Sequence, residues 1–163
     1  MNRYAITLGA LTVAAGAALS LPATAATTLN LNAVQATGAC QGALPNYEGS
    51  FRKRPLGVVN QGSTGAYLTC GARSSAFGIN QTNLIVTNRT AADADINCTV
   101  VDGLIDATLG FADFYPQVIS VPTGEFVEHQ VVGPFSYVAW SCNVPAAFEV
   151  NAVVFQVAEE IGA

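Results

Sequence analysis

The chain has 163 residues, of which 51% are hydrophobic and only 10% are charged. This hydrophobic content is too high for a disordered protein and is sufficient for a packed core. Eleven acidic residues exceed six basic ones, which gives a formal net charge of −5. Because an acidic surface is repelled by phosphate backbones and anionic lipid, the composition disfavours binding to nucleic acid or to membrane surfaces.

The first 25 residues have the organisation of a signal peptide. Arg3 provides a positive start, residues 5–21 form an apolar run, and Ala23 and Ala25 give the small-residue pattern of a cleavage site. We therefore expect cleavage after Ala25 and export to the periplasm or the extracellular space. No later stretch approaches the ~20 apolar residues that a membrane span requires.

The remaining chain, residues 26–163, has a length that suits one domain. It keeps five basic and eleven acidic residues, a net charge of −6. Because charged residues are sparse, its surface must be covered largely by Asn, Gln, Ser and Thr. We therefore predict a single exported domain without a membrane span.

Apolar and polar residues alternate with a period of two over most of this domain, a period that is typical of β-strands. The first predicted strand is residues 27–34, in which Leu29 and Leu31 alternate with polar residues and give a half-exposed strand. Three later pairs of segments each flank a turn-rich stretch and are predicted to form hairpins. These pairs are residues 55–60 with 66–70, 84–88 with 96–101, and 116–122 with 126–132.

The last two predicted strands, residues 137–143 and 150–157, are separated by Pro145. Residues 102–113 fit at most one turn of helix, because their glycines oppose a longer one. The predicted fold class is therefore all-β, an antiparallel β-sandwich of the Greek-key or jelly-roll kind. We expect about eight to ten short strands and two disulfides.

The four cysteines, Cys40, Cys70, Cys98 and Cys142, are an even set in a chain predicted to be exported, so two disulfides are the default. Successive cysteines stand 28 to 44 residues apart, whereas zinc ligands usually occur in close pairs. The single histidine, His129, has no cysteine near it in the sequence. No metal site and no cofactor are therefore expected. Four cysteines allow three pairings, and the sequence does not decide among them.

We prefer the pairs Cys40–Cys70 and Cys98–Cys142. Cys98 and Cys142 lie in strong strand patterns, whereas Cys40 lies in a Gly-rich connection. Cys98 and Cys142 both fall on the more apolar side of their strands, as a bridge between two sheets would require. The immunoglobulin arrangement does not fit, because Trp140 stands only two residues before Cys142.

Arg52-Lys53-Arg54 is the most distinctive short segment, because it contains three of the five basic residues of the mature chain. Such a charge run is usually a solvated surface, here at the start of a strand. The alternative is a basic recognition loop closed by a Cys40–Cys70 bridge. In that case the protein would be a peptidase inhibitor.

No catalytic motif is present in the sequence. Glu128 and His129 form the only acid–base pair suited to proton transfer, but neighbouring residues of a strand point to opposite faces. No serine stands in a G-x-S-x-G turn. We therefore expect a non-catalytic protein.

Two further groups suggest binding. Asp93, Asp95, Asp102 and Asp106 form an acidic cluster, but their spacing does not match a calcium-binding EF-hand loop, so solvated turn residues are the better interpretation. The aromatic residues include candidates for a sugar-stacking platform, and residues 111–115 are the segment most favoured for exposure.

Five segments together resemble small exported bacterial proteins that have a disulfide-bonded β-sandwich. They are CQGALP at residues 40–45, RKRPLG at 52–57, AYLTC at 66–70, INCTVV at 96–101 and EEIG at 159–162. The resemblance implies an exported sandwich and no activity, so it supplies no functional residue. Fimbrial subunits are also exported and β-rich, but the ending AEEIGA lacks their penultimate aromatic residue.

The sequence thus predicts an exported, non-catalytic protein that binds a partner or associates with the cell envelope. The partner is unknown, and either a protein or a glycan fits. One alternative function is a peptidase inhibitor that presents Arg52 to Arg54. The other is an envelope assembly subunit, in which a neighbouring copy would complete an edge strand.

Overall fold

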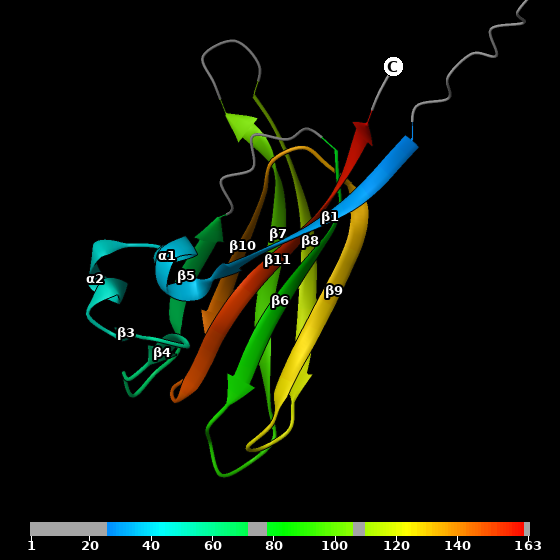
Figure 1. The fold of residues 1–163 in the computed structure, drawn as a ribbon. Coiled ribbons are helices and arrows are strands. Elements are labelled where there is room, and N and C mark those ends of the chain that lie inside the picture. The colour runs from blue at the N-terminus through cyan, green and yellow to red at the C-terminus, as the bar shows by residue number, and fades with distance from the viewer. Residues whose placement is uncertain (1–25, 72–77, 106–109, 162–163) are drawn as a thin grey trace, which may run out of the picture.

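The computed structural model describes residues 26–71, 78–105 and 110–161, which form two β-sheets packed face to face (Figure 1). The strands are β1 (Ala26–Gln35), β2 (Cys40–Gly42), β3 (Phe51–Arg54), β4 (Gly57–Asn60), β5 (Ala66–Gly71), β6 (Ile79–Asn88), β7 (Ala94–Ile105), β8 (Gly110–Val121), β9 (Phe126–Phe135), β10 (Val138–Val144) and β11 (Phe148–Ile161). Sheet A has the order β3-β4-β11-β6-β9, and β1 also pairs with β11. Sheet B has the order β2-β5-β10-β7-β8. All of these strand pairs are antiparallel.

The predicted all-β sandwich is confirmed, and its strand order is that of a jelly roll. Strands β4-β11-β6-β9 of sheet A lie against β5-β10-β7-β8 of sheet B, so that each consecutive pair from β4 to β11 is split between the sheets, except β7 and β8, which pair within sheet B. The described residues contain eleven strands, more than the predicted eight to ten, and several are long rather than short. Strands β7 and β8 have 12 residues each, and β11 has 14.

The three predicted hairpins are wrong, although their strands exist. Strands β4 and β5, β6 and β7, and β8 and β9 are each consecutive in the chain but belong to different sheets. The turn-rich stretches between them are corners that carry the chain from one sheet to the other. A turn signal marks where a strand ends, but it does not decide which neighbour the next strand joins.

Two of these corners are held by the same side-chain arrangement. At the end of β4, Asn60 donates two hydrogen bonds, to the carbonyl of Thr64 in the corner and to that of Val144 at the end of β10. At the end of β6, Asn88 donates in the same way to Ala92 and to Val121 of β8.

Each side-chain oxygen also accepts a backbone N–H two residues further along the chain. Asn60 and Asn88 are both fully buried. Their amides therefore tie sheet A to sheet B at the point where each corner begins.

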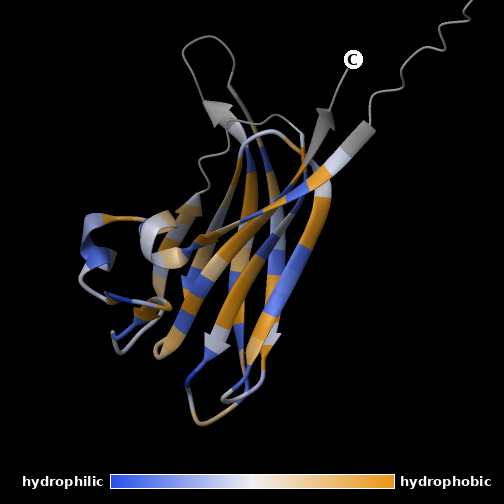
Figure 2. Ribbon diagram, in the orientation of Figure 1, coloured by the Kyte–Doolittle hydropathy of each residue, from blue (hydrophilic) through white to orange (hydrophobic). Residues whose placement is uncertain are grey.

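The core lies between the sheets and is built by alternating strand residues, visible as alternating colours along the strands (Figure 2). Among the described residues, Trp140 of β10 is the largest fully buried side chain, and its indole Nε1 donates to Thr82 Oγ1 of β6 at 2.8 Å. This bond joins the centres of the two sheets. Phe135, Phe148 and Phe155 are also buried and fill the same layer.

Both disulfides lie within sheet B. They join Cys40 to Cys70 and Cys98 to Cys142, with a Cα–Cα distance of 4.0 Å in each pair. In each case the two residues are direct partners across adjacent strands, β2 with β5 and β7 with β10. The expectation of a bridge between the sheets is therefore wrong. The two cysteines of each pair lie directly opposite each other in one sheet, so both face the core. The alternation of residues shows only that a cysteine faces the core, and it cannot distinguish a bridge within one sheet from a bridge between the two sheets.

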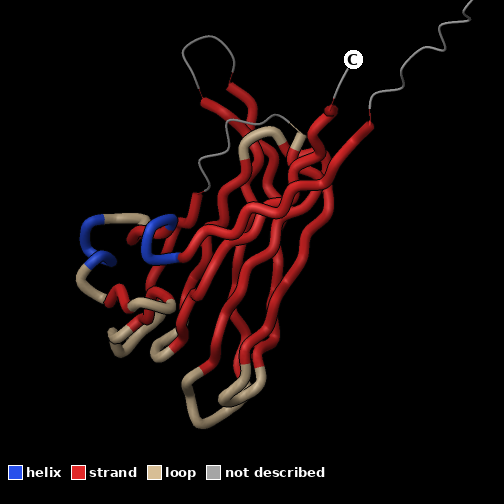
Figure 3. The backbone as a smooth tube through the Cα atoms, in the orientation of Figure 1, coloured by secondary structure: helices blue, strands red, loops and turns tan. Residues whose placement is uncertain are grey.

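Helix is confined to two single turns in the described residues, α1 (Ala36–Ala39) and α2 (Pro45–Glu48), at one side of the sandwich (Figure 3). The helical turn expected within residues 102–113 is wrong where the structure describes them, because this stretch belongs to β7 and β8. These two strands pair with each other as a true hairpin. No helix among the described residues is long and apolar enough to cross a membrane.

Candidate functional site

The outer face of sheet B carries a shallow hollow of about 370 Å³. The pairing register places its side chains in rows that run across four strands. Asn97 of β7 lies between Val118 of β8 and Asn143 of β10, and Asn143 lies beside Tyr67 of β5. The next row contains Pro116, Thr99, Ser141 and Thr69. The lining of the hollow is Tyr67, Asn97, Cys98, Thr99, Pro116, Gln117, Val118, Ser141 and Asn143.

These side chains are polar but uncharged. None of the residues that line the hollow is acidic or basic. The amides of Asn97 and Asn143 and the hydroxyls of Thr99 and Ser141 offer both donors and acceptors. Their side chains make no hydrogen bond with other described residues, so this capacity is available to a ligand.

Apolar surface borders the polar centre on two sides. Tyr67 is 46% exposed at one side, and its ring lies 5.9 Å from that of Tyr47. Val118 is 63% exposed at the other side, next to Pro116. Phe114 stands further along the same face of β8 and is 65% exposed. The hollow thus combines hydrogen-bonding groups with flat apolar margins.

The floor of the hollow is covalently fixed. Cys98 lies under it, and its bridge to Cys142 joins β7 to β10, the two central strands of the site. The Cys40–Cys70 bridge joins β5 to β2 on the Tyr67 side. A surface built on paired strands with cross-strand bridges holds its side chains in place before a ligand binds, which lowers the entropic cost of binding.

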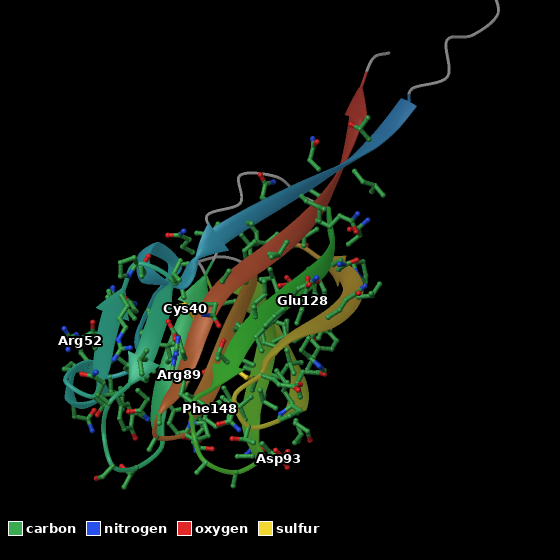
Figure 4. All side chains as sticks on the ribbon, turned by 60° about the horizontal axis from the view of Figure 1, so that its bottom comes forward. Cys40, Arg52, Arg89, Asp93, Glu128 and Phe148 are labelled. Carbon is green, nitrogen blue, oxygen red and sulfur yellow. A yellow bond between two sulfur atoms is a disulfide. The ribbon has the colours of Figure 1, made fainter. Side chains whose placement is uncertain are left out.

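The basic segment is not a loop. Arg52, Lys53 and Arg54 form β3, where they pair with β4 at the edge of sheet A. All three are exposed, and Arg52 projects from the periphery of the molecule (Figure 4). The segment is thus an exposed edge strand, because the turn at residues 55–56 folds it back onto β4.

A smaller hollow of about 270 Å³ lies beside this basic strand and is lined in part by Arg54, Gln61 and Arg89. Arg89 also donates to the carboxylate of Glu149, which is 1% exposed, and forms an ion pair with it. The Arg89 charge is therefore already used to compensate a buried carboxylate.

Glu128 and His129 point to opposite faces of β9, as their adjacency predicts. Glu128 accepts a hydrogen bond from Asn83 on the outer face of sheet A. His129 faces inward, where its Nε2 lies 3.0 Å from Gln117 Oε1 and its ring lies edge-on to Trp140. Burial lowers the pKa of His129 below its usual value of 6.5. The partner of the imidazole is thus an uncharged amide, which orients the ring but supplies no acid or base.

The acidic cluster does not converge. Asp93 accepts the backbone N–H of Thr123, and Asp95 accepts the hydroxyl of Ser120. Asp102 is buried and accepts two backbone N–H groups, those of Ser136 and Tyr137, at 2.8 and 2.7 Å. Asp106 lies outside the described residues. Among the residues that are described, no group of three or more His, Cys, Asp and Glu side chains could hold a metal ion.

Sequence reasoning located the strands of the hollow but missed the hollow itself. Asn97, Ser141 and Asn143 are the polar alternates of the strands that contain Cys98 and Cys142. Once the cysteines are placed on the inner face, the period of two puts these residues on the outer face. The sequence therefore indicates that these polar side chains lie on the outer face, but it does not give the strand order that brings them together.

No protein-family model matches this chain, and no curated protein matches it in sequence. Several solved structures are similar to it at low levels. The C-terminal CBM6 of LamC, a marine laminarinase from Zobellia galactanivorans, shows 13% identity and a TM-score of 0.45 over 77% of this chain and 98% of its own. The CBM22-1–GH10 modules of Clostridium thermocellum xylanase 10B, complexed with xylohexaose, show 12% identity and a TM-score of 0.44 over 65% of this chain.

This chain covers only 22% of that xylanase structure. TmCBM61, in complex with β-1,4-galactotriose, shows 9% identity and a TM-score of 0.36 over 80% of this chain and 88% of its own. Similarities of this size assign neither a family nor a ligand to the chain.

Proposed function

We propose that this chain is an exported, non-catalytic protein that binds a neutral carbohydrate in the hollow on the outer face of sheet B. The observation that carries the proposal is the chemistry of the lining. Sugar hydroxyls both donate and accept hydrogen bonds, as the amides of Asn97 and Asn143 and the hydroxyl of Ser141 do. A sugar ring also has apolar C–H faces, which suit an exposed aromatic ring such as Tyr67.

Charge supports a neutral ligand. An anionic ligand would gain no cation in the hollow, and a cationic one would gain no carboxylate, because none of the lining residues is charged. A hydrophobic ligand would bury the unpaired amides of Asn97 and Asn143, which costs free energy for each unsatisfied group. A polyhydroxylated neutral molecule avoids both penalties.

Export belongs to the same proposal. Residues 1–25 carry the pattern of a removable signal peptide, and residues 26–163 are proposed as the single mature domain. Two disulfides are consistent with an oxidising compartment outside the cytosol. A protein that binds glycans would act in the cell envelope or the surrounding medium, where glycans are exposed.

The peptidase-inhibitor alternative has less support. Arg52, Lys53 and Arg54 have their backbone paired with β4 along one edge, so the segment is not displayed as a free loop. Stoichiometric inhibition of a trypsin-like protease, lost when all three are replaced by alanine, would restore this alternative.

Calorimetry of binding to neutral oligosaccharides of glucose, xylose, mannose and galactose tests the proposal. The variant Asn97→Ala/Asn143→Ala removes two amides from the centre of the hollow and is expected to weaken binding at least about tenfold, since a hydrogen bond contributes about 1 kcal/mol and 1.4 kcal/mol is a factor of ten. Tyr67→Ala removes the exposed ring and is expected to weaken binding to a similar degree.

Gln130→Ala is the matched control, because it removes an exposed amide from the outer face of sheet A instead. Binding by the Gln130→Ala protein should equal that of the wild type. The proposal fails if no neutral sugar of the panel binds. It also fails if a bound sugar is unaffected by the Asn97→Ala/Asn143→Ala change.

A further inference from the structure

The basic residues of this acidic chain gather at one corner of sheet A. Residues 26–163 contain eleven acidic residues but only five basic ones. Four of these five are at the β3 edge of the sheet or line the hollow beside it: Arg52, Lys53, Arg54 and Arg89. The fifth, Arg73, lies outside the described residues. An anion is therefore attracted to this corner of a chain that is otherwise acidic.

The three cations of β3 have no anionic partner in the described part of the chain. Arg52, Lys53 and Arg54 are exposed, and their side chains form no ion pair or hydrogen bond with a described residue. Glu48 is the acidic residue nearest to them in the sequence, but its carboxylate accepts the backbone N–H of Gly42. The charge of Arg54 is therefore available to a ligand.

The hollow of about 270 Å³ that Arg54 and Arg89 line opens on the outer side of sheet A. Val59 of β4 is part of the lining, and the pairing register places it next to Glu149 of β11. The neighbours of Glu149 in β11, Phe148 and Val150, belong to the core, so Glu149 and Val59 face outward. This hollow is thus on the opposite side of the sandwich from the neutral hollow of sheet B.

Arg89 is fixed on one side and open on the other. Its Nε and Nη2 contact the same carboxylate oxygen, Oε2 of Glu149. A guanidinium carries five N–H donors, and Nη1 of Arg89 makes no hydrogen bond with a described residue. The side chain is 49% exposed, although Glu149 is buried. The buried carboxylate therefore orients the guanidinium and leaves part of it free to donate into the hollow.

The backbone wall of the hollow contains a residue in an unfavourable conformation. Ala147 has a φ of 62°, and it is the one residue other than glycine with a positive φ in the described ranges. Its N–H donates to the carbonyl of Asn60 at 2.9 Å, and its carbonyl accepts the N–H of Arg89 at 3.3 Å. Such conformations persist where the surrounding structure enforces them, and they are concentrated at ligand sites. These bonds also fix the wall relative to Arg89 before any ligand binds.

The charges at the hollow favour a ligand with a single negative charge. None of the lining residues is acidic, and the charge of Arg89 is compensated by Glu149. Arg54 is thus the one uncompensated charge in the lining, which suits one carboxylate better than a doubly charged phosphate. Apolar groups of Val59, Ala146 and Ala147 also line the hollow and suit the organic part of a ligand.

We propose that this hollow binds the carboxylate group of a small organic acid, with Arg54 and the free side of Arg89 as the donors. The planar fork of a guanidinium matches the two oxygens of a carboxylate, and hydrogen bonds between charged groups are stronger than neutral ones. This site is separate from the proposed sugar site, and neither depends on the other.

Nuclear magnetic resonance of the ¹⁵N-labelled protein at neutral pH tests the proposal. The probes are acetate and glucuronate, and their neutral counterparts, acetamide and glucose, are the controls. Both carboxylates should shift the backbone amide signals of residues that line the hollow, whereas the neutral compounds should not. The signals to follow are those of Gln61, Gly62, Ala146 and Ala147.

Arg54→Gln removes the uncompensated charge and should weaken carboxylate binding at least about tenfold, because it replaces a charge-assisted hydrogen bond by a neutral one. Arg54 is exposed, so the fold should be retained. Lys53→Gln is the matched control, because it removes the same charge from the same strand. Lys53 shares its face of β3 with Phe51, which packs against the core, and it does not line the hollow. Its replacement should leave binding close to that of the wild type.

The proposal is overturned if neither carboxylate shifts these signals or if the neutral compounds shift them equally. It is also overturned if Lys53→Gln weakens binding as much as Arg54→Gln, since the effect would then be general electrostatic attraction, or if phosphate binds as tightly as acetate. Asn97→Ala/Asn143→Ala should leave the shifts in this hollow unchanged. Glucuronate shifts confined to the hollow of sheet B would support the sugar site and contradict this one.

Discussion

Sheets A and B are stabilised in different ways. Sheet B contains all four cysteines, and its bridges join β2 to β5 and β7 to β10. The described strands of sheet A contain no cysteine. Arg89 forms an ion pair with the buried carboxylate of Glu149 in this sheet, and strand β1 carries exposed leucines. A face whose strands are joined by disulfides suits a ligand that needs side chains in set positions.

The largest effect is expected from removing the bridge at the centre of sheet B. Cys98→Ser/Cys142→Ser should lower the free energy of unfolding by about 2–5 kcal/mol, the usual cost for a disulfide of a small exported domain. Chemical denaturation measures the change. If the bridge also fixes the floor of the hollow, sugar binding should weaken at the same time, under conditions where the variant is still folded.

Cys40→Ser/Cys70→Ser is the comparison for that variant. Its bridge spans 30 residues rather than 44 and lies at the edge of sheet B. A comparable loss of stability with unchanged sugar binding would support the central role of the Cys98–Cys142 bridge. Equal loss of binding in the two variants would contradict it.

The next largest effect concerns the amides that join the sheets. Asn60→Ala and Asn88→Ala should each lower the free energy of unfolding by about 2–3 kcal/mol, because each change leaves a buried carbonyl, that of Val144 or Val121, without its side-chain partner and removes two part-buried hydrogen bonds. The two losses should be similar, since three hydrogen bonds are equivalent at the two corners and Asn88 accepts only one more, from the hydroxyl of Thr90. Thermal and denaturant unfolding of both variants checks this, and a loss below about 0.5 kcal/mol, typical of a surface change, would contradict it.

A smaller effect is expected at the ion pair of sheet A. Arg89→Met should lower the free energy of unfolding by about 1.5–3 kcal/mol, because the buried Glu149 carboxylate loses its charged hydrogen-bond partner. The double variant Arg89→Met/Glu149→Leu should recover much of this loss, since it leaves no buried charge uncompensated. A double variant as unstable as the single one would show that the ion pair is not the cause.

The smallest expected effect is a pH dependence of the free energy of unfolding that arises from His129, which lies between the sheets. Because the pKa of His129 is lowered in the folded protein, the unfolded chain binds a proton more readily. The contribution of His129 to stability is therefore constant above a pH of about 6.5, the pKa of the unfolded residue, and is lost as the pH falls through the lower folded value.

His129→Leu should remove this part of the pH dependence. Unfolding measured across that pH range in the wild type and in the variant provides the test. A variant with the same pH profile as the wild type would assign the dependence to other groups.

The alternation of residues was sufficient to predict strands, because a period of two follows from the geometry of a single strand. It also favoured the disulfide pairs Cys40–Cys70 and Cys98–Cys142, which the structure contains. It failed at Leu29 and Leu31, where the apolar face of the strand lies outside. Burial there depends on the register between β1 and β11, which one strand does not contain.

The corners show the same limit. Residues 61–65 and 89–93 have the composition of hairpin turns, yet both carry the chain between sheets. Asn60 and Asn88 stabilise these crossings by bonds to carbonyls of β10 and β8, which are distant in the sequence. A local pattern cannot specify partners that are 84 and 33 residues away.

The sequence by itself determined an all-β domain with sparse charge and two disulfides, because strand period, composition and an even cysteine set are local or global properties of the chain. Only the tertiary structure decided that both bridges lie in one sheet, that Asn97 and Asn143 meet Tyr67 on its outer face, and that Leu29 and Leu31 of β1 are exposed. Each of these depends on strand order and register, and both are set by packing between segments far apart in the chain.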